Sequence, residues 1–279
     1  MEAAAWEQLR KYDSDPDAAW EILSVKQKVK KIEPLPLDTP MQPGYTRFVC
    51  FSDTHTMHEG VDIPPGDVLI NAGDFTNMGH PKDVAKFNEF LGTQPHPHKI
   101  VVAGNHDLTF DPESYQRLWK RFGHAEMFDC QATREMMTDC TLLQDSETTI
   151  NGIRVYGSPW QPEFCDWAFN LPRGDQLREK WAKIPSGIDV LITHGPPIGH
   201  GDLCTGGNRA GCVDLLQTVQ MIKPSYHVFG HIHEGYGVTE DGLGTTYINA
   251  SSCNLQYKPI NPCVIFDLPN RRLGRFGLQ

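Results

Sequence analysis

Short runs of apolar residues that end in polar loops alternate with helical patterns over most of the chain. In the runs predicted as strands, apolar and β-branched residues dominate, whereas the helical segments repeat their apolar positions every three or four residues. Such alternation predicts an α/β fold. Strands are expected at 47–52, 67–73, 99–105, 189–194, 226–231 and 245–250, and helices at 82–91 and 212–222.

Two turn signals indicate that some strands pair antiparallel. Asn151-Gly152 lies between the runs TTI and IRVYG, and Asn-Gly between two apolar runs is a strong hairpin signal. Asp241-Gly242 is a second dipeptide of this kind and predicts another tight turn. We therefore expect mixed sheets.

The N-terminal segment differs in pattern from the rest. A helix is predicted over Asp13–Lys31, with Ser14 or Asp15 as its cap and lysines in its last turn. The proline-rich segment 33–44 should then run extended along the surface. We expect two parts: residues 1–44, an N-terminal helix with a proline-rich extension, and residues 45–279, a single domain, since 279 residues with 39% hydrophobic content can bury one substantial core.

Two stretches allow more than one interpretation. Residues 108–140 contain two predicted helices with aromatic positions, which either cap a site or pack on the sheet. The segment 159–169 is rich in tryptophan and phenylalanine. It forms either an aromatic wall on which a nucleobase stacks or a packed surface loop. Its aromatic residues are Trp160, Phe164, Trp167 and Phe169.

Charge and cysteine content limit the classes of partner and compartment. The formal net charge is −10 and no segment collects lysine and arginine into a basic stripe, so a long nucleic acid is not an expected partner. The eight cysteines are scattered without a C-x-x-C pair and are expected as free thiols. No signal pattern or membrane-spanning run is found, so we expect a cytoplasmic protein without a membrane partner. The oligomeric state stays open.

Five short motifs of Asp, Asn and His follow the predicted strands. Ligands of open α/β sheets bind at such strand ends. Asp-x-His and His-x-His each direct two ligand atoms to the same side of an extended segment, and a second Asp can offer one carboxylate oxygen to each of two metals. Asp, Asn and His suit manganese, iron and zinc. The motifs are Asp53-Thr-His55, Gly73-Asp74, Gly104-Asn105-His106-Asp107, Thr193-His194-Gly195 and Gly230-His231-Ile-His233.

In this order the motifs resemble those of the calcineurin-like metallophosphoesterase family. The sequence in and around them is also similar to that of one branch of the family, the metallophosphoesterase-domain-containing proteins. The segments that carry this similarity include RFVCFSDTH, LPRG, THGPP and FGHIHEGYG. The resemblance implies a four-layer α/β/β/α sandwich of two mixed sheets. It also implies a centre of two divalent metal ions, for which manganese is favoured and iron, cobalt and zinc are alternatives.

The resemblance further assigns roles to the motif residues. Asp74 bridges the two metals, and the retained His231 implies that the second site is complete. Asn77 departs from the family pattern, in which a further Asp is common at this position. The environment that this residue gives the Asp74 carboxylate is therefore expected to differ from that in other family members. One metal is expected on Asp53, His55 and His233, and the other on Asn105, His194 and His231.

Catalytic and substrate-binding roles are expected beside the metals. His106 faces the substrate phosphate together with Asn105 and can protonate the leaving alkoxide. Asp107 either orients the His106 ring or caps a turn. Tyr236 is expected to line the rim of the site.

The resulting hypothesis is a metal-dependent phosphodiesterase that hydrolyses small phosphate esters, cyclic nucleotides among them, by means of a hydroxide between the two metals. One alternative is a phosphomonoesterase or protein phosphatase with the same metals. Another is a low-activity scaffold that binds metal and nucleotide. Motifs determine the reaction class and leave the substrate open.

Overall fold

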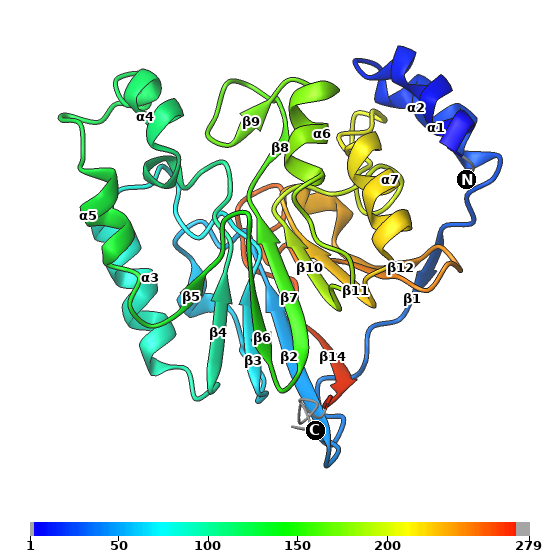
Figure 1. Cartoon of the computed structure of the whole chain (residues 1–279). Coiled ribbons are helices and arrows are strands. Elements are labelled where there is room, and N and C mark those ends of the chain that lie inside the picture. Colours follow the sequence, from blue (N-terminus) through cyan, green and yellow to red (C-terminus); the bar gives the residue numbers. More distant parts are fainter. Residues whose placement is uncertain (1–2, 272–279) are drawn as a thin grey trace, which may run out of the picture.

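Two β-sheets packed face to face form the centre of the structure, a computed structural model that describes residues 3–271 of the chain (Figure 1). Helices cover both outer faces, so the predicted four-layer α/β/β/α sandwich is confirmed. In spatial order, one sheet contains β14 (Val264–Pro269), β2 (Tyr45–Phe51), β3 (Val68–Asn71), β4 (His98–Val101) and β5 (Thr141–Leu142). The other contains β1 (Lys30–Ile32), β12 (Gly237–Glu240), β13 (Thr246–Asn249), β11 (Tyr226–Phe229), β10 (Val190–Thr193), β7 (Ile153–Ser158) and β6 (Ser146–Ile150).

Both sheets are mixed, as expected. Strands β2, β3, β4 and β5 are parallel, and β14 joins β2 antiparallel at the edge. In the larger sheet β7, β10, β11 and β13 are parallel, whereas β6 pairs antiparallel with β7, β12 with β13, and β1 with β12. Asn151 and Gly152 have φ values of 50° and 79° and form the predicted hairpin turn. The strands β12 and β13 also pair antiparallel, but residues 241–245 connect them in a longer loop than the predicted tight turn.

The core between the sheets explains why the strands are apolar nearly throughout. Alternate residues of a strand face opposite sides: Phe48 and Cys50 of β2 face the inner core, whereas Val49 and Phe51 pack under the outer helices. Both faces are buried, so no polar alternation develops. Phe266 of β14 stacks on Phe48, with ring centroids 4.8 Å apart.

Helices α3 (Pro81–Thr93), α4 (Pro112–Leu118) and α5 (Cys130–Glu135) lie on one side of the paired sheets, and α6 (Asp175–Trp181) and α7 (Val213–Ile222) on the other (Figure 1). Helix α3 follows its sequence pattern, because Val84, Phe87 and Leu91 share one face and are buried against the sheet. None of the helices within residues 3–271 is long and apolar enough to cross a membrane.

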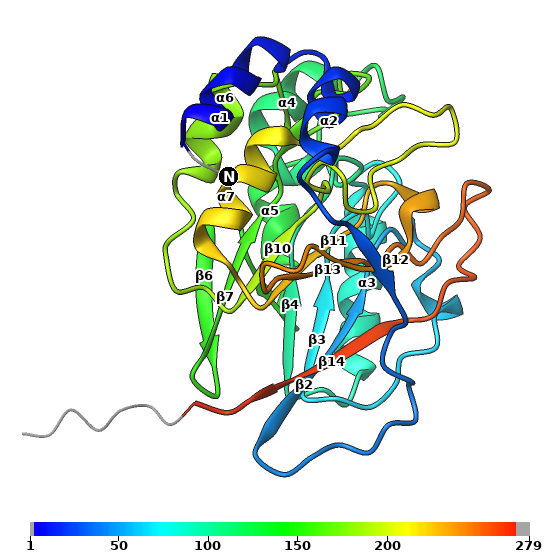
Figure 2. The ribbon, with the colours of Figure 1, turned by 90° about the vertical axis from the view of Figure 1, so that its right-hand side faces the viewer.

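The N-terminal segment differs from its prediction. The helix expected over Asp13–Lys31 is α2 (Pro16–Ser24), preceded by α1 (Ala3–Leu9). Asp15 caps α2 by accepting a hydrogen bond from the Ala18 amide. Farther on, Lys30–Ile32 form β1 and pair with β12 (Figure 2), since pairing with an open sheet edge outweighs the local helical tendency of the lysine run.

The same segment is packed on the rest of the molecule. Trp6 and Leu23 are buried in one cluster with residues of α7 and of the larger sheet. Trp20 lies against Gly199, where an added Cβ would collide with the indole ring, and the Arg209 guanidinium lies 4.3 Å from the centre of that ring. Residues 1–44 therefore contact the loop that follows β10.

Candidate metal centre

The five motifs follow the carboxyl ends of parallel strands in both sheets. Those of Asp53, Asp74 and Asn105 come after β2, β3 and β4, and those of His194 and His231 come after β10 and β11. Since the sheets are packed face to face with these ends at the same edge, residues far apart in sequence meet there. A bridge between Ser52 and Ser251 joins the two sheets beside the site.

Carboxylate and imidazole groups form two clusters with the spacing of metal ligands. Within each cluster, one ligand atom from every member lies within 4.8 Å of the others. A third cluster, His55, Asp74 and His106, overlaps both. The structure thus brings together every Asp and His that was expected as a metal ligand, with His106 beside them. The first two clusters are Asp53, His55 and His233, and Asp74, His194 and His231.

Asp74 lies between the two clusters and uses its carboxylate oxygens differently. Its Oδ2 is 3.3 Å from Nε2 of His194 and 3.9 Å from Nε2 of His55. Its Oδ1 accepts a hydrogen bond of 2.8 Å from the His106 amide. Oδ2 thus faces both clusters while a backbone amide engages Oδ1, and the expectation that each oxygen serves one metal stays a prediction.

Asp53 is held in a similar way. Its Oδ2 accepts hydrogen bonds from the hydroxyls of Ser52 and Ser251, at 2.5 and 2.8 Å, and the His231 amide donates to both oxygens. The Oδ1 atom lies 3.7 Å from Nε2 of His233. The carboxylate is fully buried, so these donors fix its orientation and leave Oδ1 directed at the cluster.

The backbone at the site is strained. Asp53, His55, Asp74 and His231 have positive φ values of 50°, 44°, 54° and 69°, a region that residues with a Cβ rarely adopt and that clusters at functional sites. The motif glycines permit the close approach of the loops. A Cβ on Gly104 would collide with Oδ1 of Asp74.

Hydrogen bonds to backbone carbonyls determine which ring nitrogen faces the centre. Nδ1 of His194 donates to the Ala72 carbonyl at 2.8 Å, and Nδ1 of His233 donates to that of Asn254 at 3.0 Å. Their Nε2 atoms therefore carry the lone pairs that bind metals. Nε2 of His55 and Nε2 of His233 lie 3.2 Å apart. A cation between two such nitrogens fits this arrangement, and the set of donors suits a divalent metal ion.

Burial and charge shift the pKa values in opposite directions within the site. Burial lowers the pKa of His55 to about 4 and that of His231 to about 3. Burial also opposes protonation of His194 and His233, but the charges and hydrogen bonds of Asp74 and Asp53 raise both pKa values to about 9. The two carboxylates thus counteract the effect of burial at the imidazoles next to them.

His106 occupies the mouth of the site. Its Nε2 lies 4.0 Å from Oδ2 of Asp74, and its Nδ1 donates to the carbonyl of Asn77 at 2.9 Å. The ring packs against Trp167, with centroids 4.0 Å apart. The Asn105 side chain lies deeper, with Oδ1 3.0 Å from Nε2 of His194. Both side chains line the pocket, as expected for residues that contact substrate.

Asp107 does not orient the His106 ring, and this alternative is corrected. Its buried carboxylate accepts hydrogen bonds from the amides of Gly104, Asp74 and Thr76, at 2.8, 3.0 and 2.9 Å. The Thr76 hydroxyl donates to it as well. Burial and the nearby charge of Asp74 raise the pKa of Asp107 to about 7. Asp107 ties the loops after β3 and β4 together beneath the site.

A cavity of about 580 Å³ opens beside the metal centre. Tyr236 does not belong to its lining, which corrects the predicted role at the rim, because its hydroxyl donates to the carbonyl of Pro262 and its ring packs against the inner core. Tyr257 lines the cavity instead, with its ring 4.6 Å from that of His55. Tyr257 lies in an irregular loop without periodicity, so the sequence carried no signal for it.

Some aromatic residues of segment 159–169 line the cavity, as an aromatic wall would, and others are packed against the protein. Phe164 and Trp167 line the cavity, from the loop between β8 (Gln161–Pro162) and β9 (Asn170–Leu171). Phe169 is buried in the core, and Trp160 packs beneath Lys180.

The stretch 108–140 contacts the loop between β8 and β9 through residues of its first half. The ring of Phe122 lies 4.2 Å from that of Trp167, and Arg117 and Arg121 both pair with Asp166. No residue of 108–140 belongs to the lining found within residues 3–271. The packing interpretation therefore holds for this stretch.

The chain is similar to known proteins over most of its length. A family model described as "Calcineurin-like phosphoesterase" matches residues 46–235, which include all five motifs. The human "Metallophosphoesterase domain-containing protein 1" is 50% identical over 276 residues, covering 94% of this chain and 84% of the human protein. "UPF0046 protein T07D4.2" of Caenorhabditis elegans is 44% identical over 277 residues, covering 94% of this chain and 69% of that protein.

Proposed function

Because the chain belongs to the calcineurin-like phosphoesterase family, in the branch of metallophosphoesterase-domain-containing proteins, and is a metal-dependent phosphoesterase, we propose that it cleaves phosphodiesters of small organic molecules. Cyclic nucleotides are the substrates we favour. The observation that carries this proposal is the position of Asp74, whose Oδ2 faces two ligand clusters at once. Two-metal phosphoesterases require a shared oxygen ligand in that position.

Two divalent ions would be held by the motif residues. Asp53, His55 and His233 would bind one ion, and Asn105, His194 and His231 the other, with Asp74 between them. Metal ions in such a pair lower the pKa of bound water and neutralise charge on the phosphoryl group. Manganese is favoured because the donors mix oxygen with imidazole nitrogen.

The residues of the chain itself would position and protonate the substrate. The Asn105 amide and His106 line the cavity beside the clusters and would contact phosphoryl oxygens. His106 donates from Nδ1 to the Asn77 carbonyl, which leaves Nε2 directed at the site. A proton held at Nε2 would pass to the leaving alkoxide. Trp167 limits movement of this ring by packing on it.

The cavity supports a small organic substrate. Its volume of about 580 Å³ exceeds what a phosphate group fills, and the exposed ring of Phe164 offers an apolar face for a planar group such as a nucleobase. A phosphomonoesterase or protein phosphatase would use the same metals, and a scaffold would bind nucleotide without turning it over. The full set of ligands favours an active enzyme over the scaffold.

A comparison of two chromogenic substrates tests the proposal. The purified protein, loaded with Mn(II) and analysed for metal content, is assayed with bis(p-nitrophenyl) phosphate and with p-nitrophenyl phosphate. We expect about two metals per chain and a higher kcat/KM for the diester. A higher kcat/KM for the monoester would favour the phosphomonoesterase. Bound nucleotide without product would support the scaffold.

A further inference from the structure

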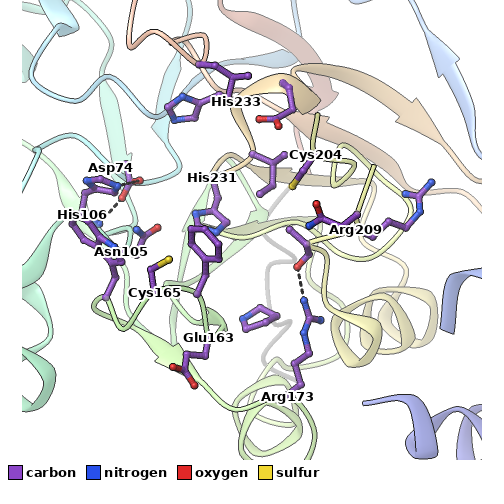
Figure 3. A pocket seen from close by; sticks show the side chains of 18 of the residues that line it. Asp74, Asn105, His106, Glu163, Cys165, Arg173, Cys204, Arg209, His231 and His233 are labelled. Carbon is purple, nitrogen blue, oxygen red and sulfur yellow. Dashed lines mark hydrogen bonds and ion pairs between the residues drawn. The ribbon is translucent and has the colours of Figure 1, made fainter. Parts of the chain in front are cut away.

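The cavity continues beyond the candidate metal centre to the guanidinium group of Arg173. Figure 3 shows Arg173 across the cavity from Asp74, Asn105 and His231. Phe164 and Pro162 are among the other lining residues. A molecule bound by the clusters can thus extend along the cavity toward the guanidinium of Arg173.

Arg173 is held in place by backbone carbonyls and not by a carboxylate. Its two terminal nitrogens donate to the carbonyls of Gly211 and Ala210, at 2.7 and 2.8 Å. Among residues 3–271 no carboxylate lies within ion-pair distance of it. A guanidinium has five N–H donors, so these two bonds fix its orientation and leave further donors for a ligand.

A second arginine of the cavity provides a contrast. Arg209 also contributes to the lining, but its guanidinium pairs with the buried carboxylate of Asp202 at 2.5 Å and packs on Trp20. Its charge is therefore already compensated. Of these two arginines, only Arg209 forms an ion pair with a described carboxylate.

The acidic residues of the cavity leave Arg173 accessible to an anion. Glu234 accepts a hydrogen bond from the Thr205 amide at 2.8 Å, and the carboxylate of Glu163 is turned away from Arg173 in Figure 3. Burial lowers the pKa of Arg173 from the ordinary value of arginine, and the charges of Asp202, Asp214 and Asp17 oppose this shift without forming an ion pair.

We propose that Arg173 binds a second oxyanion of the substrate, a carboxylate or a phosphate, while the first phosphoryl group is held at the metal centre. The enzyme would thus prefer phosphoesters that carry another negative group at the end of an organic spacer. This inference rests on the proposed function, because the ligand must be anchored at the metals. Arginine suits such a role since its planar donors match both oxyanions.

Equilibrium binding of phosphonates, which are not hydrolysed, tests the assignment. Isothermal titration calorimetry on the Mn(II)-loaded protein would compare alkylphosphonates with ω-carboxyalkylphosphonates and α,ω-bisphosphonates over a series of chain lengths. We expect the doubly anionic ligand of best length to bind about 10- to 100-fold more tightly than its singly anionic counterpart. The carboxylate and bisphosphonate series distinguish the two oxyanions.

Variants assign the preference to Arg173. In Arg173→Gln the affinity ratio should fall toward 1, and in Arg173→Lys part of it should remain because the charge is kept. Lys180→Gln is the control, since it removes an equal charge from a lysine that packs on Trp160 outside the lining. Thermal unfolding of each variant verifies that the fold is retained.

The two hypotheses fail in different ways. If simple alkylphosphonates do not bind to the metal-loaded protein and neither nitrophenyl ester is hydrolysed, the proposed function is wrong. If alkylphosphonates bind but a second anion brings no gain, or the gain persists in Arg173→Gln, the role of Arg173 is wrong and the proposed function stands.

Discussion

The carboxylate of Asp107 accepts a hydrogen bond of 3.0 Å from the backbone amide of Asp74, so a fully buried carboxylate helps to hold the loop that bears Asp74. The same carboxylate binds the amides of Gly104 and Thr76. It thereby fixes two of the loops that carry ligands.

We predict that Asp107→Ala weakens metal binding although Asp107 is not a ligand. Four buried donors lose their acceptor, and each unsatisfied donor costs about 1–3 kcal/mol, so the melting temperature should fall as well. Metal titrations and thermal unfolding of the two proteins measure both effects. An unchanged metal affinity would show that the loops keep their conformation without this carboxylate.

Removing a ligand should abolish turnover and leave the fold. We expect Asp74→Ala and His231→Gly each to reduce kcat by roughly 100-fold or more and to lower the metal content. The fold should persist because neither side chain belongs to the apolar core. The checks are metal analysis, kinetics and circular dichroism. Full turnover with two bound metals in His231→Gly would contradict the ligand assignment.

The mixed oxygen and imidazole donors predict the order of metal activation. After chelation, Mn(II) should restore the highest activity, Fe(II) and Co(II) should substitute, and Mg(II) should be weaker because it prefers oxygen ligands alone. Initial rates at matched metal concentrations give the order. Restoration by Mg(II) and none by Mn(II) would overturn it.

His106→Ala should keep the metals and lose rate in a way that depends on the leaving group. The loss should be large for an alkoxide such as a nucleoside hydroxyl and smaller for nitrophenolate, which departs without a proton. Rates on both substrate types, with metal content as the control, test this. Equal losses would indicate that His106 only binds the phosphoryl group, and loss of a metal would make it a ligand.

A histidine outside the metal centre predicts a pH dependence of stability. Burial and the charge of Arg209 lower the pKa of His200 to about 3; its Nδ1 contacts the Thr239 hydroxyl and its ring stacks on Tyr247. The unfolded chain binds a proton there near pH 6.5 and the folded protein does not, so this histidine removes stability as pH falls below 6.5.

Replacing that histidine should flatten the pH dependence. Between pH 6.5 and 4 the unfolding free energy of His200→Gln should change less steeply than that of the wild type, by up to about 1.4 kcal/mol per pH unit. Urea unfolding of both proteins at several pH values gives the two slopes. Identical slopes would mean that His200 is protonated in the folded state.

Strands and candidate ligands could be predicted from the sequence where an apolar run is followed directly by Asp, Asn or His. Apolar runs such as 47–52 form strands because both of their faces are buried, and the motif residues converge because the fold places the carboxyl ends of those strands together. The predicted helix Asp13–Lys31 wrongly includes Lys30 and Lys31 of β1, because the partner strand β12 lies more than 200 residues later and pairing at that distance leaves no local signal.

Residues whose roles depend on tertiary contacts could not be identified from pattern. Tyr236 and Tyr257 both lie in loops near the last motif, and only the path of the chain decides which of them reaches the cavity. Because Asp107 follows His106 in the sequence, it was a candidate to orient the His106 ring. Its carboxylate instead accepts a hydrogen bond from the amide of Gly104. Arg173 lies in the LPRG stretch that carries the branch resemblance, but the residue types of that stretch do not by themselves indicate what the arginine binds.

The pairing of β1 with β12 and of β2 with β14 also constrains the order of folding. In both sheets a strand from the first 51 residues is joined to one that begins at residue 237 or later. During synthesis, β1 and β2 therefore emerge from the ribosome long before their partners β12 and β14, and the edges that pair with them stay unpaired until then. Contacts of such high sequence separation slow folding and expose nascent chains to aggregation, so this architecture favours assistance by chaperones during synthesis.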